Sequence, residues 1–144
     1  MKHADLESFR ELIENGIPFN NYLGIKLMHL EYKQCKLLLP FQEGFVGDSR
    51  RNALHGGIIS TLADTSGGFA VWSTGCLQDR ISTIDLRVDY LQPAVMKDVI
   101  ADSKVKLLGN RVANVYTAIL DNSDPTLLLA EARSVYNIRR AVDK

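Results

Sequence analysis

The chain has 144 residues, enough for one domain with a sizeable core, and 46% of them are hydrophobic. Seventeen basic residues balance seventeen acidic ones, so no overall charge favours nucleic acid or an anionic membrane. The N-terminus lacks the apolar stretch of a secretory signal. Cys35 and Cys76 lack the spacing of metal ligands and are expected to be free thiols in a reducing cytoplasm. We therefore expect a single cytoplasmic domain over residues 1–144, without metal, nucleic-acid or membrane partners.

The N-terminal part of the chain predicts a helix and two short strands. Apolar residues recur at helical spacing over 4–15, and Pro18 follows the end of that pattern. Strands are predicted over 25–32 and 34–39, and Pro40 ends the second. Between the helix and the strands, three apolar side chains are expected to pack against the core: Phe19, Tyr22 and Leu23.

A long helix, expected over about 56–74, is the element around which the rest of the chain is organised. Between Ile58 and Thr74 it has no Pro and a single charged side chain, Asp64. Small and apolar residues occupy nearly every side of this helix, so we expect it to be buried all round. Residues 41–53 predict a loop that leads directly to the start of the helix.

Four segments after the helix predict strands, over 81–91, 99–107, 112–120 and 126–138. Alternation in the first of them predicts one face with Ile84, Leu86, Val88 and Tyr90, and an opposite face with Thr83, Asp85, Arg87 and Asp89. One apolar helix followed by a meander of strands predicts an α+β fold in which a curved antiparallel sheet wraps the helix. Such a sheet has exposed edges, which favour pairing between subunits.

The start of the long helix has the features of an oxyanion-binding site. Free N–H groups and the helix dipole favour negative charge there, and Gly56 and Gly57 allow a ligand to approach the backbone closely. Donors aimed at a carbonyl oxygen stabilise the transition state of acyl transfer. Asp64 would then be the base or the nucleophile, because it is the one carboxylate within this helix.

The spacing of these groups predicts a homodimer. Gly56 and Asp64 are eight residues apart, which is about 12 Å along a helix axis. A reacting carbonyl needs both groups within about 3 Å. Two such helices lying antiparallel across a two-fold axis would bring Gly56 of one subunit to the partner's Asp64, giving two equivalent sites.

These residues resemble the signature of the PaaI-like acyl-CoA thioesterases of the hotdog-fold superfamily. The resemblance spans 54–113, and the strand pattern fits as far as Ile138. The matching segments are Leu54-His55-Gly56-Gly57, Leu62-Ala63-Asp64, Gly67 or Gly68 with Ala70, Asp85-Leu86-x-Val88-x-Tyr90-Leu91-x-Pro93-Ala94, and Gly109-Asn110-Arg111-Val112-Ala113.

The resemblance implies a hotdog fold and hydrolysis of an acyl- or aryl-acyl-CoA thioester, with coenzyme A as part of the substrate and no other cofactor. It implies that the Gly56 N–H polarises the thioester carbonyl and that Asp64 from the partner subunit activates water or attacks directly. His55 would position the helix start or the thioester, and Thr83 would help to hold the water. Homodimers of this kind are expected to pair further into a tetramer.

The remaining candidates concern substrate binding. Asn52 and Ser49 lie in the loop where the family offers a polar side chain, and Gly57 adjoins the oxyanion donor. Basic residues suit the phosphates of CoA; the candidates are Arg111, Lys104, Lys106, Arg50 and Arg51. An acyl group needs an apolar slot, for which the candidates are Phe45, Phe69 and Trp72. Ordinary surface charge and ordinary core packing are the alternative interpretations of these two sets.

Two other functions compete with hydrolysis. A hotdog dehydratase or hydratase would pair a catalytic His with a carboxylate, but His3 is terminal and His29 lies in the first predicted strand. A non-catalytic acyl-CoA-binding or regulatory module is the main alternative. Such a binder has no need of the Asp64 carboxylate beside an anionic ligand, so this residue favours the enzyme.

Overall fold

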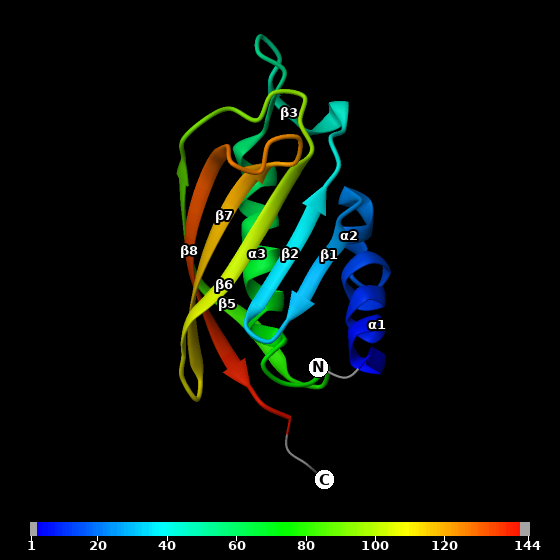
Figure 1. Cartoon of the computed structure of the whole chain (residues 1–144), viewed down its shortest axis with the longest axis vertical. Coiled ribbons are helices and arrows are strands. Elements are labelled where there is room, and N and C mark those ends of the chain that lie inside the picture. Colours follow the sequence, from blue (N-terminus) through cyan, green and yellow to red (C-terminus); the bar gives the residue numbers. More distant parts are fainter. Residues whose placement is uncertain (1–2, 142–144) are drawn as a thin grey trace.

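The computed structural model describes residues 3–141, so the two ends of the expected 1–144 domain lie outside the described residues. A long helix, α3 (Gly56–Trp72), lies within a curved antiparallel sheet (Figure 1), which is the expected hotdog arrangement. The strand order in the sheet is β1-β2-β6-β7-β8-β5. The strands are β1 (Lys26–Glu31), β2 (Gln34–Leu39), β5 (Arg80–Tyr90), β6 (Val99–Leu108), β7 (Val112–Asp121) and β8 (Leu128–Arg139).

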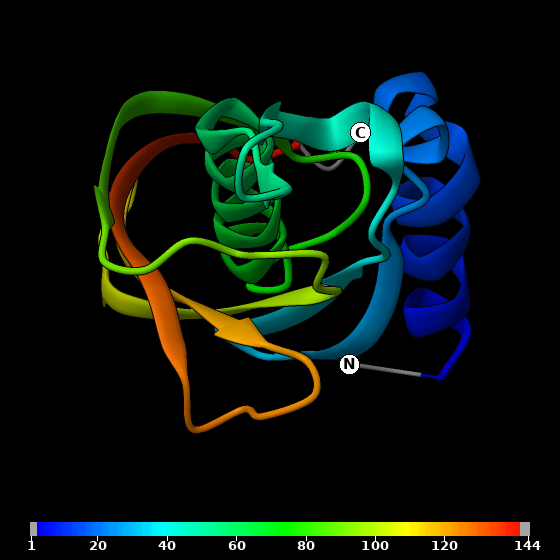
Figure 2. The same ribbon diagram turned by 90° about the horizontal axis from the view of Figure 1, so that it is seen from above.

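The N-terminal segment closes the side of the curled sheet beside β1 (Figure 2). It comprises α1 (His3–Glu11), a π-helical turn (Leu12–Gly16) and α2 (Pro18–Leu23), which ends at Gly24 with φ 73°. Phe9 is buried and packs edge-on against Phe69 and Trp72 of α3. The expected helix over 4–15 is therefore present, with its last turn widened.

The expectation that Phe19 and Tyr22 pack against the core is wrong. Leu23 is buried, but Phe19 is 53% exposed and Tyr22 is 73% exposed. Their rings stack on each other with centroids 6.4 Å apart. The short helix α2 directs only one of its sides toward the core, and Leu23 and Asn20 occupy that side.

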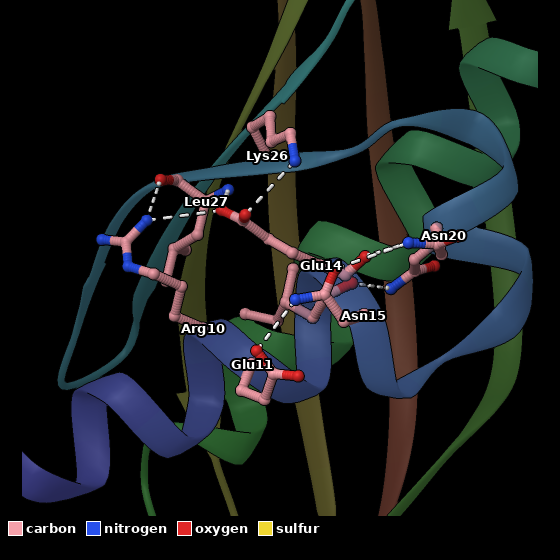
Figure 3. Close-up of polar contacts among 9 residues, drawn as sticks. Arg10, Glu11, Glu14, Asn15, Asn20, Lys26 and Leu27 are labelled. Atoms are coloured by element: carbon pink, nitrogen blue, oxygen red, sulfur yellow. Dashed lines mark hydrogen bonds and ion pairs between the residues drawn. The ribbon is translucent and has the colours of Figure 1, made fainter.

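Glu14 fastens the N-terminal segment to β1 (Figure 3). Its carboxylate accepts the Leu27 N–H at 2.9 Å and lies 3.4 Å from both Lys26 Nζ and Arg10 Nη1. Arg10 also donates to the Leu27 carbonyl at 2.9 Å. Burial alone would raise the pKa of Glu14, but the Leu27 N–H and the Lys26 and Arg10 charges outweigh it and hold this pKa below its usual range.

The expectation that α3 is buried all round is wrong for the single chain. Its sheet-facing side is buried, with Leu62, Ala63 and Ala70 fully enclosed. Another stripe stays exposed or half-buried, and it comprises Gly57, Thr61, Asp64, Thr65 and Gly68. The sheet wraps the helix from one side only, so one side of α3 has no cover within this chain.

A chain of buried hydroxyls joins α3 to the sheet. Ser103 of β6 donates to Ser66 of α3 at 2.8 Å and lies 2.7 Å from the Thr117 hydroxyl of β7. Ser66 in turn donates to the carbonyls of Cys35 and Ala101, at 3.2 and 3.4 Å. Since each hydroxyl carries one proton, Thr117 is the donor to Ser103, and the polar groups satisfy one another in sequence.

A β-bulge in β5 reverses part of the predicted alternation. The register with β8 shifts between Thr83 and Asp85, so Ile84 is the extra residue and is 58% exposed. The expectation that Ile84 shares a face with Leu86 is therefore wrong. Thr83, not Ile84, lies on the α3 side together with Leu86 and Val88.

Residues 41–53 are not a plain loop as expected. They include a 3₁₀ turn (Glu43–Phe45) and β3 (Val46–Asp48), which pairs with β4 (Ala53–Leu54) in a small two-stranded ribbon. Backbone bonds from Leu54 to Ala94 and from Met96 to Asn52 fasten this ribbon to the chain after β5. Over residues 3–141, no helix is long and apolar enough to cross a membrane.

Gly67 and Gly68 provide a matched pair for testing the packing of α3. A Cβ at Gly67 would overlap the Tyr136 hydroxyl and lie 3.2 Å from Ser134 Oγ, whereas a Cβ at Gly68 would make an ordinary 3.5 Å contact with the Tyr136 ring. We expect Gly67→Ala to lower the free energy of unfolding by about 1–3 kcal/mol. Gly68→Ala should be neutral or raise it by up to about 1 kcal/mol. Urea denaturation measures both, and equal effects would contradict this packing.

Glu14 gives the stability a defined pH dependence. Because its pKa is lower in the folded state, its contribution is present above the ordinary value of 4.5 and is lost as the pH falls through the lowered one. We expect Glu14→Gln to cost about 0.5–1 kcal/mol at pH 7 and progressively less in acid. Denaturation at several pH values measures this difference. Glu11→Gln is the control, since among residues 3–141 the Glu11 carboxylate bonds the Asn15 amide and no cation. A constant difference for Glu14→Gln would contradict the assignment.

Candidate active site

His55 is the residue that starts α3. Its backbone N–H donates to the Phe45 carbonyl at 2.8 Å, and its own carbonyl accepts the Ile58 N–H at 3.0 Å. Its Nδ1 accepts the Gly57 N–H at 2.8 Å, so the imidazole is the N-cap of the helix. The Gly57 N–H is therefore already used within the chain and is not available to a ligand.

Gly56 carries the open donor at the helix start. Within residues 3–141, its N–H has no hydrogen-bond acceptor, in contrast to the N–H groups of Gly57 and Ile58. The Tyr90 and Ser60 hydroxyls lie 2.8 and 3.1 Å from the Gly56 carbonyl and also within hydrogen-bond distance of each other, so their two protons are shared among these three contacts. Tyr90 and Ser60 thus hold the Gly56–Gly57 peptide group, and the bond from the Ile58 N–H to the His55 carbonyl holds the peptide group that carries the open Gly56 N–H.

A cleft of about 480 Å³ opens at this end of α3. His55, Gly56 and Tyr90 line it together with the end of β5 and residues of the β3–β4 ribbon. Arg51 of the ribbon also lines it, and its Nε donates to Asp48 at 2.8 Å. That hydrogen bond, joined by those of Arg50, holds the pKa of Asp48 below its usual range.

Asp64 is held through one of its two carboxylate oxygens. Oδ1 accepts the Thr83 hydroxyl at 2.7 Å and lies 3.3 Å from the Tyr136 hydroxyl, which also donates to the Asp64 carbonyl at 2.7 Å. Oδ2 has no hydrogen-bond donor among the described residues. Burial raises the pKa of Tyr136 far above its usual range, so its hydroxyl stays protonated as a donor. The carboxylate is thereby oriented and keeps one oxygen free to react.

A second cleft, of about 400 Å³, opens beside Asp64 and Thr83. It lies between the N-terminal segment and α3, and Phe69 and Trp72 also line it. It shares no lining residue with the cleft at Gly56. Within one chain, the open N–H and the open carboxylate oxygen therefore face different clefts.

The structure places the other predicted site residues in several environments. Ser49 and Asn52 lie at the exposed tip of the β3–β4 ribbon, and neither lines the cleft at Gly56 or the cleft at Asp64. Asn52 has a left-handed backbone, with φ 51°. Phe69 is buried and stacks on Trp72 with ring centroids 5.4 Å apart. Phe45 is buried and contributes its carbonyl to His55.

Of the five basic candidates, Arg51 lines the cleft at the helix start, and the other four do not. Arg111 lies in the β6–β7 hairpin, at the opposite end of the molecule from the start of α3 (Figure 1), and lines a third cleft with Arg139 and Arg140. Lys106 places its Nζ 5.6 Å from the centre of the Tyr116 ring, which also contacts Arg133. Lys104 is exposed on β6, and Arg50 is exposed on the ribbon.

Sequence reasoning missed Tyr136, Tyr90 and Ser60. Tyr136 is the cross-strand partner of Thr83, so both hydroxyls reach Asp64 from adjacent strands. The paired glycines at 67 and 68 were the one sequence feature that pointed to a residue such as Tyr136, because a missing side chain inside a helix leaves room for a large neighbour.

Comparisons with known proteins identify the family of this chain. A family model described as the thioesterase superfamily matches residues 52–127. The medium/long-chain acyl-CoA thioesterase YigI of Salmonella typhimurium is 34% identical over 141 residues, covering 89% of this chain and 90% of that protein. YigI of Escherichia coli is 31% identical over the same length and coverage.

Solved structures show the same fold. A protein from the thioesterase superfamily superposes with a TM-score of 0.85 and 29% identity, covering 94% of this chain and 99% of that one. Thioesterase HI1161 of Haemophilus influenzae superposes with a TM-score of 0.82 and 20% identity, covering 96% and 92%. Since the family match includes the start of α3, Asp64 and Thr83, the chain belongs to the thioesterase superfamily.

Proposed function

We propose that this protein hydrolyses medium- or long-chain acyl-CoA thioesters to a free acid and CoA, as a PaaI-like homodimer with two sites. The observation that carries the proposal is the pairing of two open groups on one helix: the Gly56 N–H and the Asp64 Oδ2. The names of the YigI relatives support the class of substrate. The two free thiols, Cys35 and Cys76, suit a cytoplasmic location.

The chemistry follows from these two groups. The Gly56 N–H donates to the thioester oxygen, which gains negative charge as the carbonyl carbon becomes tetrahedral. As a general base, Asp64 takes a proton from water while the oxygen of that water bonds to the carbonyl carbon. The carbon–sulfur bond then breaks, and the CoA thiolate takes the proton from the Asp64 carboxyl group. As a nucleophile, Asp64 would instead bond to the carbonyl carbon and expel the CoA thiolate, forming an anhydride. Water would then cleave the anhydride, which restores the Asp64 carboxylate and releases the acid, whose proton neutralises the thiolate.

The homodimer completes each site with residues of both subunits. Because Gly56 and Asp64 face different clefts, one chain cannot place a thioester against both groups. The uncovered stripe of α3 and the free edge of β5 offer a surface that a second copy would cover. An antiparallel pair of α3 helices would bring Gly56 to the partner's Asp64. Pairing of two such dimers into a tetramer remains part of the proposal.

The same two-fold arrangement supplies a basic site for the CoA phosphates. The C-terminal end of α3 and the β6–β7 hairpin lie at the same end of the molecule (Figure 1). An antiparallel pair therefore brings one subunit's hairpin end beside the other subunit's Gly56 cleft. Arg111 and Arg139 line the cleft in that hairpin end, and guanidinium groups bind phosphates through paired hydrogen bonds.

The first test is thioester hydrolysis by wild type and Asp64→Asn with acetyl-, octanoyl-, palmitoyl- and benzoyl-CoA. We expect Asp64→Asn to lower kcat by about 10²–10⁴-fold, the range that removal of a general base costs. Release of free thiol measures the rate. Asp85→Asn is the matched control on the neighbouring strand, and thermal unfolding of each variant checks the fold.

Two outcomes would contradict this proposal. Unchanged turnover in Asp64→Asn would move the chemistry to other residues. Saturable binding of acyl-CoA by the wild type without hydrolysis of any substrate would favour the non-catalytic binding module.

The phosphate site is tested with Arg111→Ala and two forms of one substrate, octanoyl-CoA and octanoyl-pantetheine. Loss of a charge-assisted hydrogen bond costs about 1.5–3 kcal/mol, so we expect KM for octanoyl-CoA to rise by about tenfold or more. The KM for octanoyl-pantetheine, which lacks the nucleotide, should stay the same. Lys36→Ala is the control, because Lys36 pairs with Asp102 on the sheet. A parallel rise for both substrates would assign Arg111 a structural role instead.

A further inference from the structure

We infer that the acyl chain lies in the cleft beside Asp64, between the N-terminal segment and α3, and that Phe19 is the residue of α2 that sets the preference for chain length. This inference rests on the proposed thioesterase function and extends it to the part of the substrate that distinguishes one acyl-CoA from another.

The lining of this cleft combines a reactive carboxylate with an apolar surface. Its polar lining comprises Asp64, whose Oδ2 has no donor among the described residues, with Asn20, Thr61, Thr65, Thr83 and Tyr136. Its apolar lining comprises Ile17, Phe19, Phe69, Trp72 and Ile81. A thioester whose carbonyl carbon reaches Asp64 must place one of its two arms in this cleft. The hydrocarbon arm suits these side chains, whereas the pantetheine arm carries amides that would lose their hydrogen bonds to water there.

The length of the cleft along α3 fits a chain of moderate length. Asp64 and Trp72 are eight residues apart on the helix, which is about 12 Å along its axis. An extended chain advances about 1.2 Å per bond, from the span of an extended residue with its three bonds. Roughly ten bonds of hydrocarbon therefore lie between the carboxylate and the indole ring.

The N-terminal segment forms a fixed wall of this cleft. Asn20 is buried, and its side chain donates to the Ile13 carbonyl at 3.0 Å, while its own carbonyl accepts the Ile25 N–H at 3.1 Å. The bonds of Glu14 then hold the same segment on β1 (Figure 3). The backbone on both sides of Phe19 is thus held by buried or partly buried contacts, so its ring is already in place when a substrate arrives.

Phe19 and Tyr22 of α2 differ in whether they line the cleft beside Asp64. Both are exposed aromatic side chains, and they stack on each other. Phe19 lines the cleft beside Asp64, but Tyr22 does not. The half-exposed Phe19 ring, which sequence patterning assigned to the core, instead presents an apolar surface to the space that the acyl chain would fill.

Chain-length preference follows from this placement. Each methylene that moves from water to an apolar surface raises kcat/KM by up to about fourfold. We therefore expect kcat/KM of the wild type to rise from butanoyl-CoA to about decanoyl-CoA and then to level off. Replacement of Phe19 by Ala removes one wall and should lower kcat/KM for decanoyl-CoA by about tenfold, with a loss that becomes smaller as the chain shortens toward butanoyl-CoA.

The test compares Phe19→Ala with Tyr22→Ala over butanoyl-, hexanoyl-, octanoyl- and decanoyl-CoA. Tyr22→Ala removes a neighbouring aromatic ring from the same helix, and we expect it to keep the wild-type slope of kcat/KM against chain length. Phe19→Leu retains apolar bulk and should restore most of the slope. Thermal unfolding of the three variants checks that α2 remains folded.

Three outcomes would overturn the inference: an unchanged slope in Phe19→Ala, an equal loss for all chain lengths, or a similar flattening in Tyr22→Ala. None of them affects the proposed thioesterase function, which depends on the response of hydrolysis to Asp64→Asn. If Asp64→Asn remains inactive while Phe19→Ala keeps the wild-type slope, the enzyme assignment stands and the acyl chain lies elsewhere.

Discussion

The hydrogen bonds between the Tyr136 hydroxyl and Asp64 are the contact on which the middle of this molecule depends. They require the side chain of a β8 residue to reach the backbone of α3, and only the missing side chain of Gly67 makes that approach possible. The same contact sets how deeply α3 lies in the curved sheet. It also turns the Asp64 carboxylate so that Thr83 can hold one oxygen and leave the other free. Packing and site geometry therefore have one common origin.

The N-terminal segment and the two clefts extend this arrangement outward. The segment covers the side of the curl beside β1 and forms the outer wall of the cleft at Asp64. The cleft at Gly56 is built from different elements, the β3–β4 ribbon and the end of β5. A buried centre thus positions two open groups that face away from each other, and a symmetric pair of chains is the simplest arrangement in which both act on one thioester.

Asp64 and Gly56 were named from motif spacing and Thr83 from the family resemblance; Thr83 does donate to Asp64, and the catalytic roles of all three stay predictions. Periodicity and motif spacing were sufficient to predict the long helix and the main strands. They could not predict the bulge in β5, because an alternating pattern continues through an extra residue without a mark in the sequence. The bulge decides that Thr83 faces α3. Tyr136 was equally invisible, since an aromatic residue at an inward position of a strand is ordinary core until its cross-strand partner is known. Phe19 was predicted to be buried because it is hydrophobic, but hydrophobicity does not identify the surface that a side chain contacts.

The buried hydroxyls of Ser66, Ser103 and Thr117 favour the native register between β6 and β7. Each proton in the series has an acceptor only when β6 and β7 are in their native register and α3 lies at its native height. A slip of one residue would turn these hydroxyls to the other face of the sheet and bring a neighbour such as Asp102 or Lys104 toward α3, leaving polar atoms unpaired in the core. An aliphatic core would tolerate such a slip more readily. These three small polar side chains therefore favour the native alignment of the helix and strands over alignments shifted by one residue.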